Sequence, residues 1–281
     1  MIFLICIERH YNGKKRADVL LFEQGLFYSR TEAQRAIMAG LISDHNHQRI
    51  DKSGEKFPIN EIFYVKNDNK KYVSRGGYKL EKALNVFNID LTDKVCLDIG
   101  ASTGGFTDVA LQNHAKLVYA LDVGYNQLSW KLRDNPQVIV MEKQNFRYST
   151  PADFTEGLPD FAMTDVSFIS LDLIMKPMFE ILKNNCDAVC LIKPQFEAGP
   201  ENVGKNGIVH DHRVHCNVIE HTILEAQKIG FNVINLDYSP IKGGKGNIEF
   251  LIHLRKDLNH LGENLWQGDI EKLVLTAVAD L

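Results

Sequence analysis

LDIGASTGGF, residues 97–106, joins an apolar run to a glycine-rich turn and the start of a helical pattern. Glycines at such a turn let a ligand approach the backbone, and a helix that begins there offers unpaired N–H groups. The turn is not a P-loop, because it lacks the GxxxxGK[ST] pattern. It also departs from the dinucleotide pattern GxGxxG, because Ser102 holds the place of the second glycine. The stretch predicts a ligand-binding turn after a strand, with a purely structural tight turn as the alternative.

The next apolar run, LVYALDVG at residues 117–124, ends on an acid. Asp122 can take the hydroxyls of a ribose there, as an acidic residue does in dinucleotide-binding folds. A ribose-binding acid without a clear pyrophosphate cradle suits a nucleoside ligand. S-adenosylmethionine (SAM) is such a ligand, because it has a ribose and an adenine but no phosphate.

From about residue 94, short apolar runs alternate with helical patterns. That alternation predicts βαβ units and a mostly parallel sheet, so the fold class is α/β. The expected helices cover residues 104–113, 125–133, 170–183 and 211–229. The last two runs, FNVINLDYS and NIEFLIHLR, are too close together for a helical crossover. We therefore expect them to pair antiparallel.

Residues 14–66 predict a small α+β module that precedes a linker at 67–75. A first helix is expected in KKRADVLLFEQG, with Val19, Leu20 and Phe22 facing inward. Short β-like runs separated by polar turns follow later in the module. These runs are LIS, QRI and IFYV.

A second helix of this module is indicated by Ser29-Arg30-Thr31-Glu32. This is a capping box, in which the Ser29 hydroxyl accepts the Glu32 N–H and the Glu32 side chain reaches back. Gly40 suits the position just after the helix end. The apolar stripe consists of Ala33, Ala36 and Ile37. Arg30 and Arg35 lie off this stripe, so we expect them to face solvent or a ligand.

Charge and cysteine usage limit the function classes. Residues 1–82 hold 15 lysines and arginines against 10 acids, whereas the remainder holds 17 against 26. A basic N-terminal part on an acidic body suggests a polyanionic partner, the alternative being an ordinary solvated surface.

Five scattered cysteines without a CxxC fit reduced thiols in a cytoplasm. The apolar start MIFLICI is seven residues long, and no other run approaches about 18, so no membrane segment is expected.

Ionisable side chains stand at the predicted ends of the strands. In open parallel sheets, ligands sit beyond the carboxyl ends of the strands. TDVSFIS places Asp165 at one such end, and LIKPQFE places Lys193 at the next. Glu249 begins the last, antiparallel strand, and Lys79 lies on a helix just before the sheet. We expect all four to converge on one cleft, the alternative being four unrelated surface charges.

Such a cleft suits proton transfer from a hydroxyl. Burial or a second ammonium lowers the pKa of a lysine and makes it a possible general base, whereas carboxylates raise that pKa and orient the amine. A base that deprotonates an RNA 2′-hydroxyl during attack makes methyl transfer feasible, because the SAM sulfonium is already activated. Alignment can then contribute about 7–11 kcal/mol. The histidines of HDHRVH (210–215) do not share a helical face, so no metal site is expected.

Taken together, the motifs resemble the TlyA family, also called hemolysin A, of SAM-dependent 2′-O-ribose methyltransferases of ribosomal RNA. The motifs with matching order and spacing are SRGGYKL, LDIGASTGGF, ALDVGYNQL, TDVSFISL, LIKPQFEAG, and SPIKG followed by GNIEF. SRTEAQRAIMAG makes residues 14–66 similar to an S4 RNA-binding domain. The resemblance implies an FtsJ-like, Rossmann-like class I methyltransferase domain at 76–281. Its mostly parallel seven-stranded sheet would contain one antiparallel strand.

The resemblance also implies roles for single residues. The family's Lys-Asp-Lys-Glu tetrad falls on Lys79, Asp165, Lys193 and Glu249. Lys193 would be the general base toward the ribose hydroxyl. The SAM site falls on Gly100, Ala101, Ser102, Gly104, Gly105, Phe106, Asp122, Asn145 and Asp165. The RNA-binding side chains fall on Arg16, Arg30, Arg35 and Arg75. RNA would then bind the S4 face and the sheet edge together.

The implied substrate is a cytidine in 16S and/or 23S ribosomal RNA, and the implied protein is a cytoplasmic monomer that works on ribosomal subunits without membrane or metal. The chain departs from the family in three stretches. These are MIFLICIERHYNG at the start, HNHQRID in place of a frequent Asn-Gly turn, and GGKGN in place of a proline-and-acid loop before Glu249.

Two other function classes stay open at this point. One is an RNA-binding ribosome-assembly factor with a SAM site whose biology does not need methylation; complementation by Lys193→Ala would favour it. The other is a membrane-acting hemolysin, which lysis of membranes by the purified protein would favour. The chain shows no amphipathic basic helix of the kind that such an activity uses.

Overall fold

In the computed structural model, the structure describes residues 13–27, 29–66 and 71–281. The chain divides into two compact units, Met1–Lys70 and Lys71–Leu281. The apolar start MIFLICI and residues 67–70 of the expected linker lie outside the described residues. Within the described ranges, no helix is long and apolar enough to cross a bilayer.

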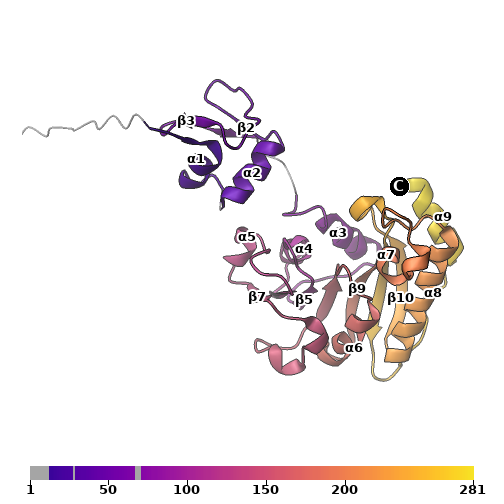
Figure 1. Ribbon diagram of the computed structural model, residues 1–281. Helices are drawn as coiled ribbons and strands as arrows, with labels where there is room; N and C mark the ends of the chain where they lie inside the picture. The colour runs from indigo at the N-terminus through magenta and orange to yellow at the C-terminus, as the bar shows by residue number, and fades with distance from the viewer. Residues whose placement is uncertain (1–12, 28, 67–70) are drawn as a thin grey trace, which may run out of the picture. The chain divides into compact units, whose positions relative to one another are not determined.

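The N-terminal unit is a small α+β body (Figure 1). Its elements are β1 (Lys14–Arg16), α1 (Ala17–Glu23), α2 (Arg30–Met38), β2 (Ile42–Ser43), β3 (Lys56–Pro58) and β4 (Tyr64–Val65). Strand β1 pairs with β3 and β2 with β4, both antiparallel. The expected run QRI contributes only an isolated bridge between Ser43 and Arg49. The sequence patterns did not indicate β1 and β3.

The buried face of α1 differs from the expected one. Ala17, Leu20 and Leu21 are buried, whereas the Phe22 side chain is 45% exposed. The prediction that Phe22 faces inward is therefore wrong. Residues i, i+3 and i+4 share one face of a helix, and the next residue along is turned by roughly 100°.

The start and end of α2 are as expected. The Ser29 hydroxyl accepts the Glu32 N–H at 3.1 Å. Gly40 follows the C-cap with a φ of 72°, the left-handed conformation that glycine adopts without strain. The predicted stripe of Ala33, Ala36 and Ile37 is buried. These features confirm the second helix.

A seven-stranded sheet forms the centre of the C-terminal unit, in the order β10-β11-β9-β8-β5-β6-β7. Its strands are β5 (Val95–Ile99), β6 (Leu117–Asp122), β7 (Val138–Glu142), β8 (Phe161–Thr164), β9 (Cys186–Ile192), β10 (Asn232–Tyr238) and β11 (Phe250–Lys256). Strand β11 is antiparallel to both of its neighbours, and the other pairs are parallel. The expected mostly parallel α/β sheet with one antiparallel strand is confirmed.

Helices surround this sheet (Figure 1). They are α3 (Gly77–Val86), α4 (Gly105–Gln112), α5 (Trp130–Arg133), α6 (Asp172–Ile181), α7 (Pro194–Glu197), α8 (His212–Ile229) and α9 (Ile270–Asp280). Single 3₁₀ turns are η1 (Phe146–Tyr148), η2 (Pro151–Asp153), η3 (Pro200–Asn202) and η4 (Gly244–Gly246). The helices expected near 104–113, 170–183 and 211–229 are present, whereas the one expected at 125–133 is reduced to the single turn α5. The sequence patterns did not indicate α9.

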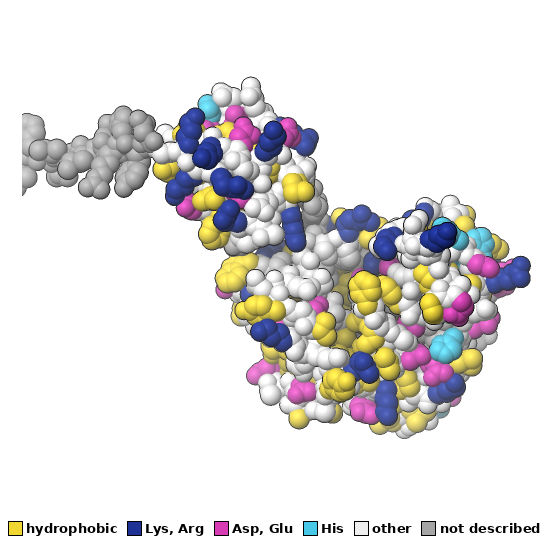
Figure 2. Space-filling view, viewed as in Figure 1, with side chains coloured by type: hydrophobic (Ala, Val, Ile, Leu, Met, Phe, Trp, Pro, Cys, Tyr) yellow, Lys and Arg dark blue, Asp and Glu magenta, His cyan; other side chains and the backbone are white. Residues whose placement is uncertain are grey.

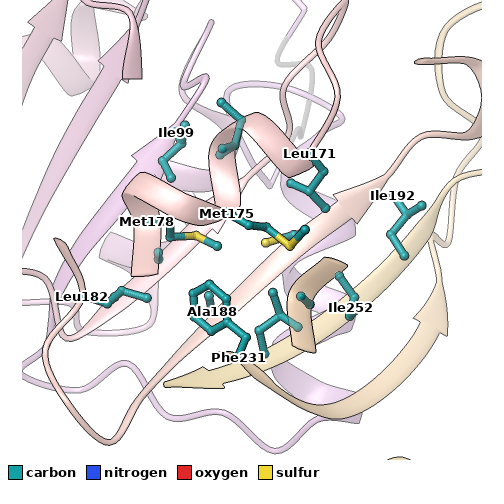
Figure 3. Packing of buried hydrophobic residues seen from close by; sticks show 14 of the residues in the cluster. Ile99, Leu171, Met175, Met178, Leu182, Ala188, Ile192, Phe231 and Ile252 are labelled. Atoms are coloured by element: carbon teal, nitrogen blue, oxygen red, sulfur yellow. The ribbon is translucent and has the colours of Figure 1, made fainter. Parts of the chain in front are cut away.

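Apolar side chains pack on both faces of the sheet. Along β9, Ala188, Cys190 and Ile192 belong to one core, and Val189 and Leu191 belong to the other. Helices α6, α8 and α9 cover the first face, part of which Figure 3 shows, and α3 and α4 cover the second. Burial on both faces is typical of parallel sheets. It leaves the strand ends as the place for polar side chains.

Candidate active site

A pocket of about 760 Å³ lies at the carboxyl ends of the parallel strands. Segments that follow β5, β8 and β9 line it, together with residues 241–249 before β11 and residues 74–79 at the start of α3. Since β11 is antiparallel, its start lies at the same edge of the sheet. The residues expected to converge all line this pocket: Lys79, Asp165, Lys193 and Glu249.

Lys79 lies on α3 and joins two carboxylates. Its Nζ donates to Glu249 Oε2 at 2.7 Å and to Asp165 Oδ2 at 3.0 Å. Both Lys79 and Glu249 are buried. Burial alone lowers the pKa of Lys79, but the charges of Asp165 and Glu249 outweigh it, so the pKa is raised. Lys79 therefore stays an ammonium ion that holds the two acids together.

Lys193 is the first residue after β9, and Pro194 begins α7 directly behind it. Proline suits this first helical position, and it ends the strand ladder because it has no N–H. Lys193 Nζ lies 2.5 Å from Asp165 Oδ1, an ion pair without the alignment of a hydrogen bond. It also donates to Ser167 Oγ at 2.9 Å and to the Asp165 carbonyl at 3.3 Å. The ammonium group thus faces one carboxylate, whereas Lys79 faces two.

The glycine-rich turn combines ligand approach with close packing. Gly100 has a φ of 82° and lines the pocket. Gly104 has a φ of 95°, which strains any other residue, and a Cβ there would lie 2.3 Å from the Leu132 side chain. A Cβ on Gly105 would lie 2.2 Å from Ser74 Oγ. The members of the turn that line the pocket are Gly100, Ala101, Ser102, Thr103, Gly105 and Phe106.

Asp98, inside the same stretch, is a residue that the sequence analysis missed. It lines the pocket yet is buried, and its Oδ2 accepts the Thr107 N–H at 2.9 Å and the Thr107 hydroxyl at 2.6 Å. Burial raises the pKa of Asp98 to about 7, against the effect of these hydrogen bonds. The sequence feature that could have indicated Asp98 is an acid two residues before the first glycine of the turn.

Of the other expected SAM-binding residues, Asp122 contacts a pocket-lining residue, whereas Asn145 has no such hydrogen bond among the described residues. Asp122 Oδ2 accepts the Ser102 N–H and Oδ1 accepts the Gly124 N–H, both at 2.7 Å. The acid thereby holds the turn and keeps one lone pair on each oxygen for a ligand. Asn145 is exposed and caps η1 by accepting the Arg147 N–H at 3.2 Å. Gly104, Asp122 and Asn145 are not among the residues that line the pocket.

The arginines expected to bind RNA belong to both units. Arg16 and Arg30 donate to the buried carboxylate of Asp18, at 2.9 Å and 3.1 Å. Figure 2 shows Lys and Arg side chains spread over the visible face of the N-terminal unit. Arg35 is exposed on α2. Arg75 is exposed and lines the pocket of the C-terminal unit.

Further lining residues at the pocket mouth were not predicted as site residues. The Phe168 side chain is 90% exposed, and its ring lies 4.9 Å from that of Phe196. Lys242 and Lys245 are exposed in the loop before Glu249. Ring and charge together at a pocket mouth would suit a nucleic acid. The sequence feature that could have indicated Lys245 is GGKGN, the stretch that departs from the family's usual loop before Glu249.

The pocket residues fit SAM. The volume is within the usual range for a small-molecule site. Gly100, Ala101 and Ser102 of the turn line the pocket. The acids Asp98 and Asp165 can face a cation. In the part of the chain that the structure describes, no three His, Cys, Asp or Glu side chains gather as metal ligands.

Comparison with known proteins gives consistent matches. Residues 72–256 match the family model of the FtsJ-like methyltransferases. YqxC of Bacillus subtilis, named as a candidate rRNA methyltransferase, is 56% identical over 86% of this chain and 85% of its own. The 16S/23S rRNA (cytidine-2′-O)-methyltransferase TlyA of Mycobacterium tuberculosis is 37% identical over 86% and 90%. A solved structure of a candidate hemolysin from Streptococcus thermophilus is 52% identical with a TM-score of 0.74, covering 96% of this chain and 97% of that one.

Proposed function

Because the chain belongs to the family of FtsJ-like methyltransferases, we propose that it methylates a ribose 2′-hydroxyl of ribosomal RNA. Methyl transfer and the use of SAM follow from the family itself. The observation that carries the finer proposal is the contact of Lys79, Asp165, Lys193 and Glu249 at the pocket beside the glycine turn. Two lysines and two carboxylates there can orient a hydroxyl, and a lysine in its neutral form can take its proton.

In this proposal Lys193 is the general base. Its Nζ is held by Asp165 and Ser167 at the end of β9, so its direction is fixed before the substrate enters. In its neutral form it accepts the proton of the 2′-hydroxyl as the oxygen attacks. Lys79 is the less suitable base, because two carboxylates keep it charged. Lys79 instead holds Asp165 and Glu249 in place.

When bound, SAM supplies a methyl group on a sulfonium, and transfer to the 2′-oxygen leaves S-adenosylhomocysteine. The turn residues Gly100, Ala101 and Ser102 would hold the nucleoside, with Asp122 available to the ribose. The buried ring of Phe106 provides an apolar contact on one side of the site. The protein thus contributes alignment and one proton acceptor.

The N-terminal unit is proposed to be an S4 RNA-binding domain at residues 14–66, joined by the 67–75 linker to the methyltransferase domain at 76–281. Its basic surface and its capped helix α2 support this. Arg16, Arg30 and Arg35, with Arg75 at the pocket, would contact RNA. The relatives named for cytidine-2′-O methylation support a cytidine of 16S and/or 23S rRNA as the target.

The test maps 2′-O-methyl groups on ribosomal RNA from cells with and without this protein. We expect at least one cytidine to lose its methyl group when the protein is absent; no change at any position would exclude the proposal.

Lys193→Ala should abolish methylation while SAM affinity, measured by calorimetry, stays within about twofold. Full activity of that variant would remove Lys193 as the base. Phenotypic rescue by an inactive Lys193→Ala would point to the assembly-factor function instead.

A further inference from the structure

The loop at residues 241–247, between β10 and β11, puts two cations at the mouth of the pocket. Lys242 and Lys245 are exposed and line the pocket, as does Arg75. Among the described residues, none of these three side chains takes part in an ion pair or a side-chain hydrogen bond. All three cations are therefore available to an anionic ligand at the pocket mouth.

The loop is fixed at its base by a buried carboxamide. Asn247 Nδ2 donates to the Gly207 carbonyl at 2.9 Å, and its Oδ1 accepts the Val209 N–H at 3.1 Å. The Gly243 N–H closes the loop on the Asn247 carbonyl at 2.9 Å. Lys245 has a φ of 60°, a conformation that non-glycine residues rarely adopt. The loop therefore presents its lysines from a defined backbone.

The position of Lys245 is also defined. A Cβ at Gly207 would lie 3.2 Å from Lys245 Nζ, so the ammonium group rests over the Gly207 backbone beside the pocket. Lysine side chains usually extend into solvent when nothing holds them. Here the absence of a side chain at Gly207 makes room for the ammonium group.

The same loop touches the buried acid. A Cβ at Gly243 would lie 2.0 Å from Glu249 Oε1, so the backbone at 243 packs directly on the Glu249 carboxylate. Glu249 in turn accepts from Lys79 and from Gln195 Nε2, the latter at 3.2 Å. One short segment thus connects the outer cations with the group of four ionisable residues.

We propose that the 241–247 loop is a phosphate-binding clasp, in which Lys242 and Lys245, with Arg75, contact the phosphates that flank the target ribose. This rests on the proposed RNA methylation. RNA phosphates supply the anions that the three cations lack, while the acids deeper in the pocket stay with Lys79 and Lys193. The clasp holds the strand against the same backbone that supports Glu249, so binding and alignment are coupled.

The test compares Lys242→Gln/Lys245→Gln with the wild type in the full chain. Binding to in vitro transcribed 16S and 23S rRNA is measured by filter binding over a range of KCl concentrations. Two lost phosphate contacts should reduce the slope of log K against log [KCl] by about 1.4. At 150 mM KCl the affinity should fall about tenfold. SAM affinity without RNA should be unchanged.

The matched control is Lys116→Gln/Lys272→Gln, which removes the same charge from exposed positions that do not line the pocket. It should leave the salt slope within about 0.3 of the wild type. Equal losses of rRNA affinity in the two double variants would mean that only net charge matters. No loss of affinity in the loop variant would mean that its lysines are merely solvated. Either result overturns the clasp. Lys242→Arg/Lys245→Arg should restore the slope.

These readouts separate the clasp from the proposed function. If the wild type binds rRNA but methylates no ribose, the proposed function fails, and the salt slopes still decide whether the loop binds phosphate. Gly243→Ala is the complementary variant, because its methyl group displaces Glu249 without changing a charge. We expect it to lower the methylation rate constant at saturating RNA while the salt slope stays at the wild-type value.

Discussion

Lys79 and Lys193 carry the same charge in one pocket but have different surroundings. Lys79 is bonded to two carboxylates, one of them Glu249, which is 2% exposed. Lys193 shares Asp165 and otherwise meets a hydroxyl and a carbonyl. At the scale of the residue, both lysines belong to a buried ion network, but Lys79 joins two carboxylates, whereas Lys193 has only one beside its Nζ.

Replacing Lys79 should affect the fold as well as the reaction. Lys79→Met leaves Glu249 as a buried charge without its cation, so we expect the free energy of unfolding to fall by about 3 kcal/mol. Urea denaturation at pH 7 measures this. Lys193→Ala is the comparison, with a smaller expected loss because the partly exposed Asp165 keeps Lys79. Combining Lys79→Met with Glu249→Gln should recover most of the stability but no activity. A Lys79→Met variant as stable as the wild type would contradict the network.

Asp98 should make the stability depend on pH near neutrality. Burial raises the pKa of Asp98 to about 7 in the folded chain, above its ordinary value of 3.8. The protonated form is favoured by folding, so this contribution is fully present below about pH 4 and is lost as the pH rises through 7. The loss can reach about 1.4 kcal/mol per pH unit. Asp98→Asn cannot ionise, so its unfolding free energy should decline less between pH 5 and 8. Parallel urea profiles for both proteins would count against the buried acid.

At the scale of the element, register joins the antiparallel strand to the parallel sheet. Arg255 on β11 lies directly opposite Asp187 on β9, and its guanidinium donates to both oxygens of that acid at 2.8 Å and 3.0 Å. His253 Nε2 lies 3.0 Å from Asp187 Oδ1. Such cross-strand pairs stabilise one register over its neighbours. This register puts Glu249 at the pocket edge, one residue before β11.

The pairing of β9 with β11 should weaken in acid. Burial alone raises the pKa of Asp187, but hydrogen bonds from His253 and Arg255 outweigh it and lower that pKa to about 2. The carboxylate is favoured by folding, so its contribution of about 2 kcal/mol is present above about pH 4 and is lost as the pH falls through 2. In Asp187→Asn the acid-induced loss should be smaller by this amount, measured by urea unfolding from pH 5 to 2. Asp134→Asn, at an exposed position, should retain the wild-type profile; an equal change in both would attribute the effect to net charge.

The elements that the sequence predicts are those with many buried positions. Apolar runs such as β9 are buried on both faces, so their pattern is unambiguous. Strands β1 and β3 are short and mostly exposed, and their pairing depends on chain segments about 40 residues apart. Periodicity carries no signal for such strands.

The site was predictable to a similar degree. Strand ends gave Asp165 and Lys193, because topology fixes where they lie. The resemblance to the TlyA family was needed to predict that Lys193 acts as the general base. The lysines at 242 and 245 and the buried Asp98 were missed, because their importance depends on loop packing and burial that no local pattern reveals. Asp18 is a similar case: an acid on the buried face of α1 becomes intelligible only with Arg16, Arg30 and Gln34 around it.

At the scale of the whole molecule, the excess of basic residues and the candidate active site belong to different units. The basic residues concentrate in the N-terminal part, and the pocket lies entirely within the C-terminal unit. Contacts made equally in the ground state and the transition state change KM without changing kcat. A division of this kind therefore predicts that variants of the two units differ in which kinetic constant they alter.

Arg30 provides the sharpest test of that division. Its side chain is 52% exposed, and without it Asp18 keeps both hydrogen bonds from Arg16 and one from Gln34. Arg30→Gln should therefore remain folded but lose one phosphate contact, so KM for rRNA should rise about fivefold with kcat within twofold of the wild type. Steady-state methylation of rRNA measures both constants, with Lys116→Gln as a control of equal charge change. A fall in kcat with KM unchanged would mean that the N-terminal unit acts on the chemical step, because remote binding energy is then used for alignment at the ribose.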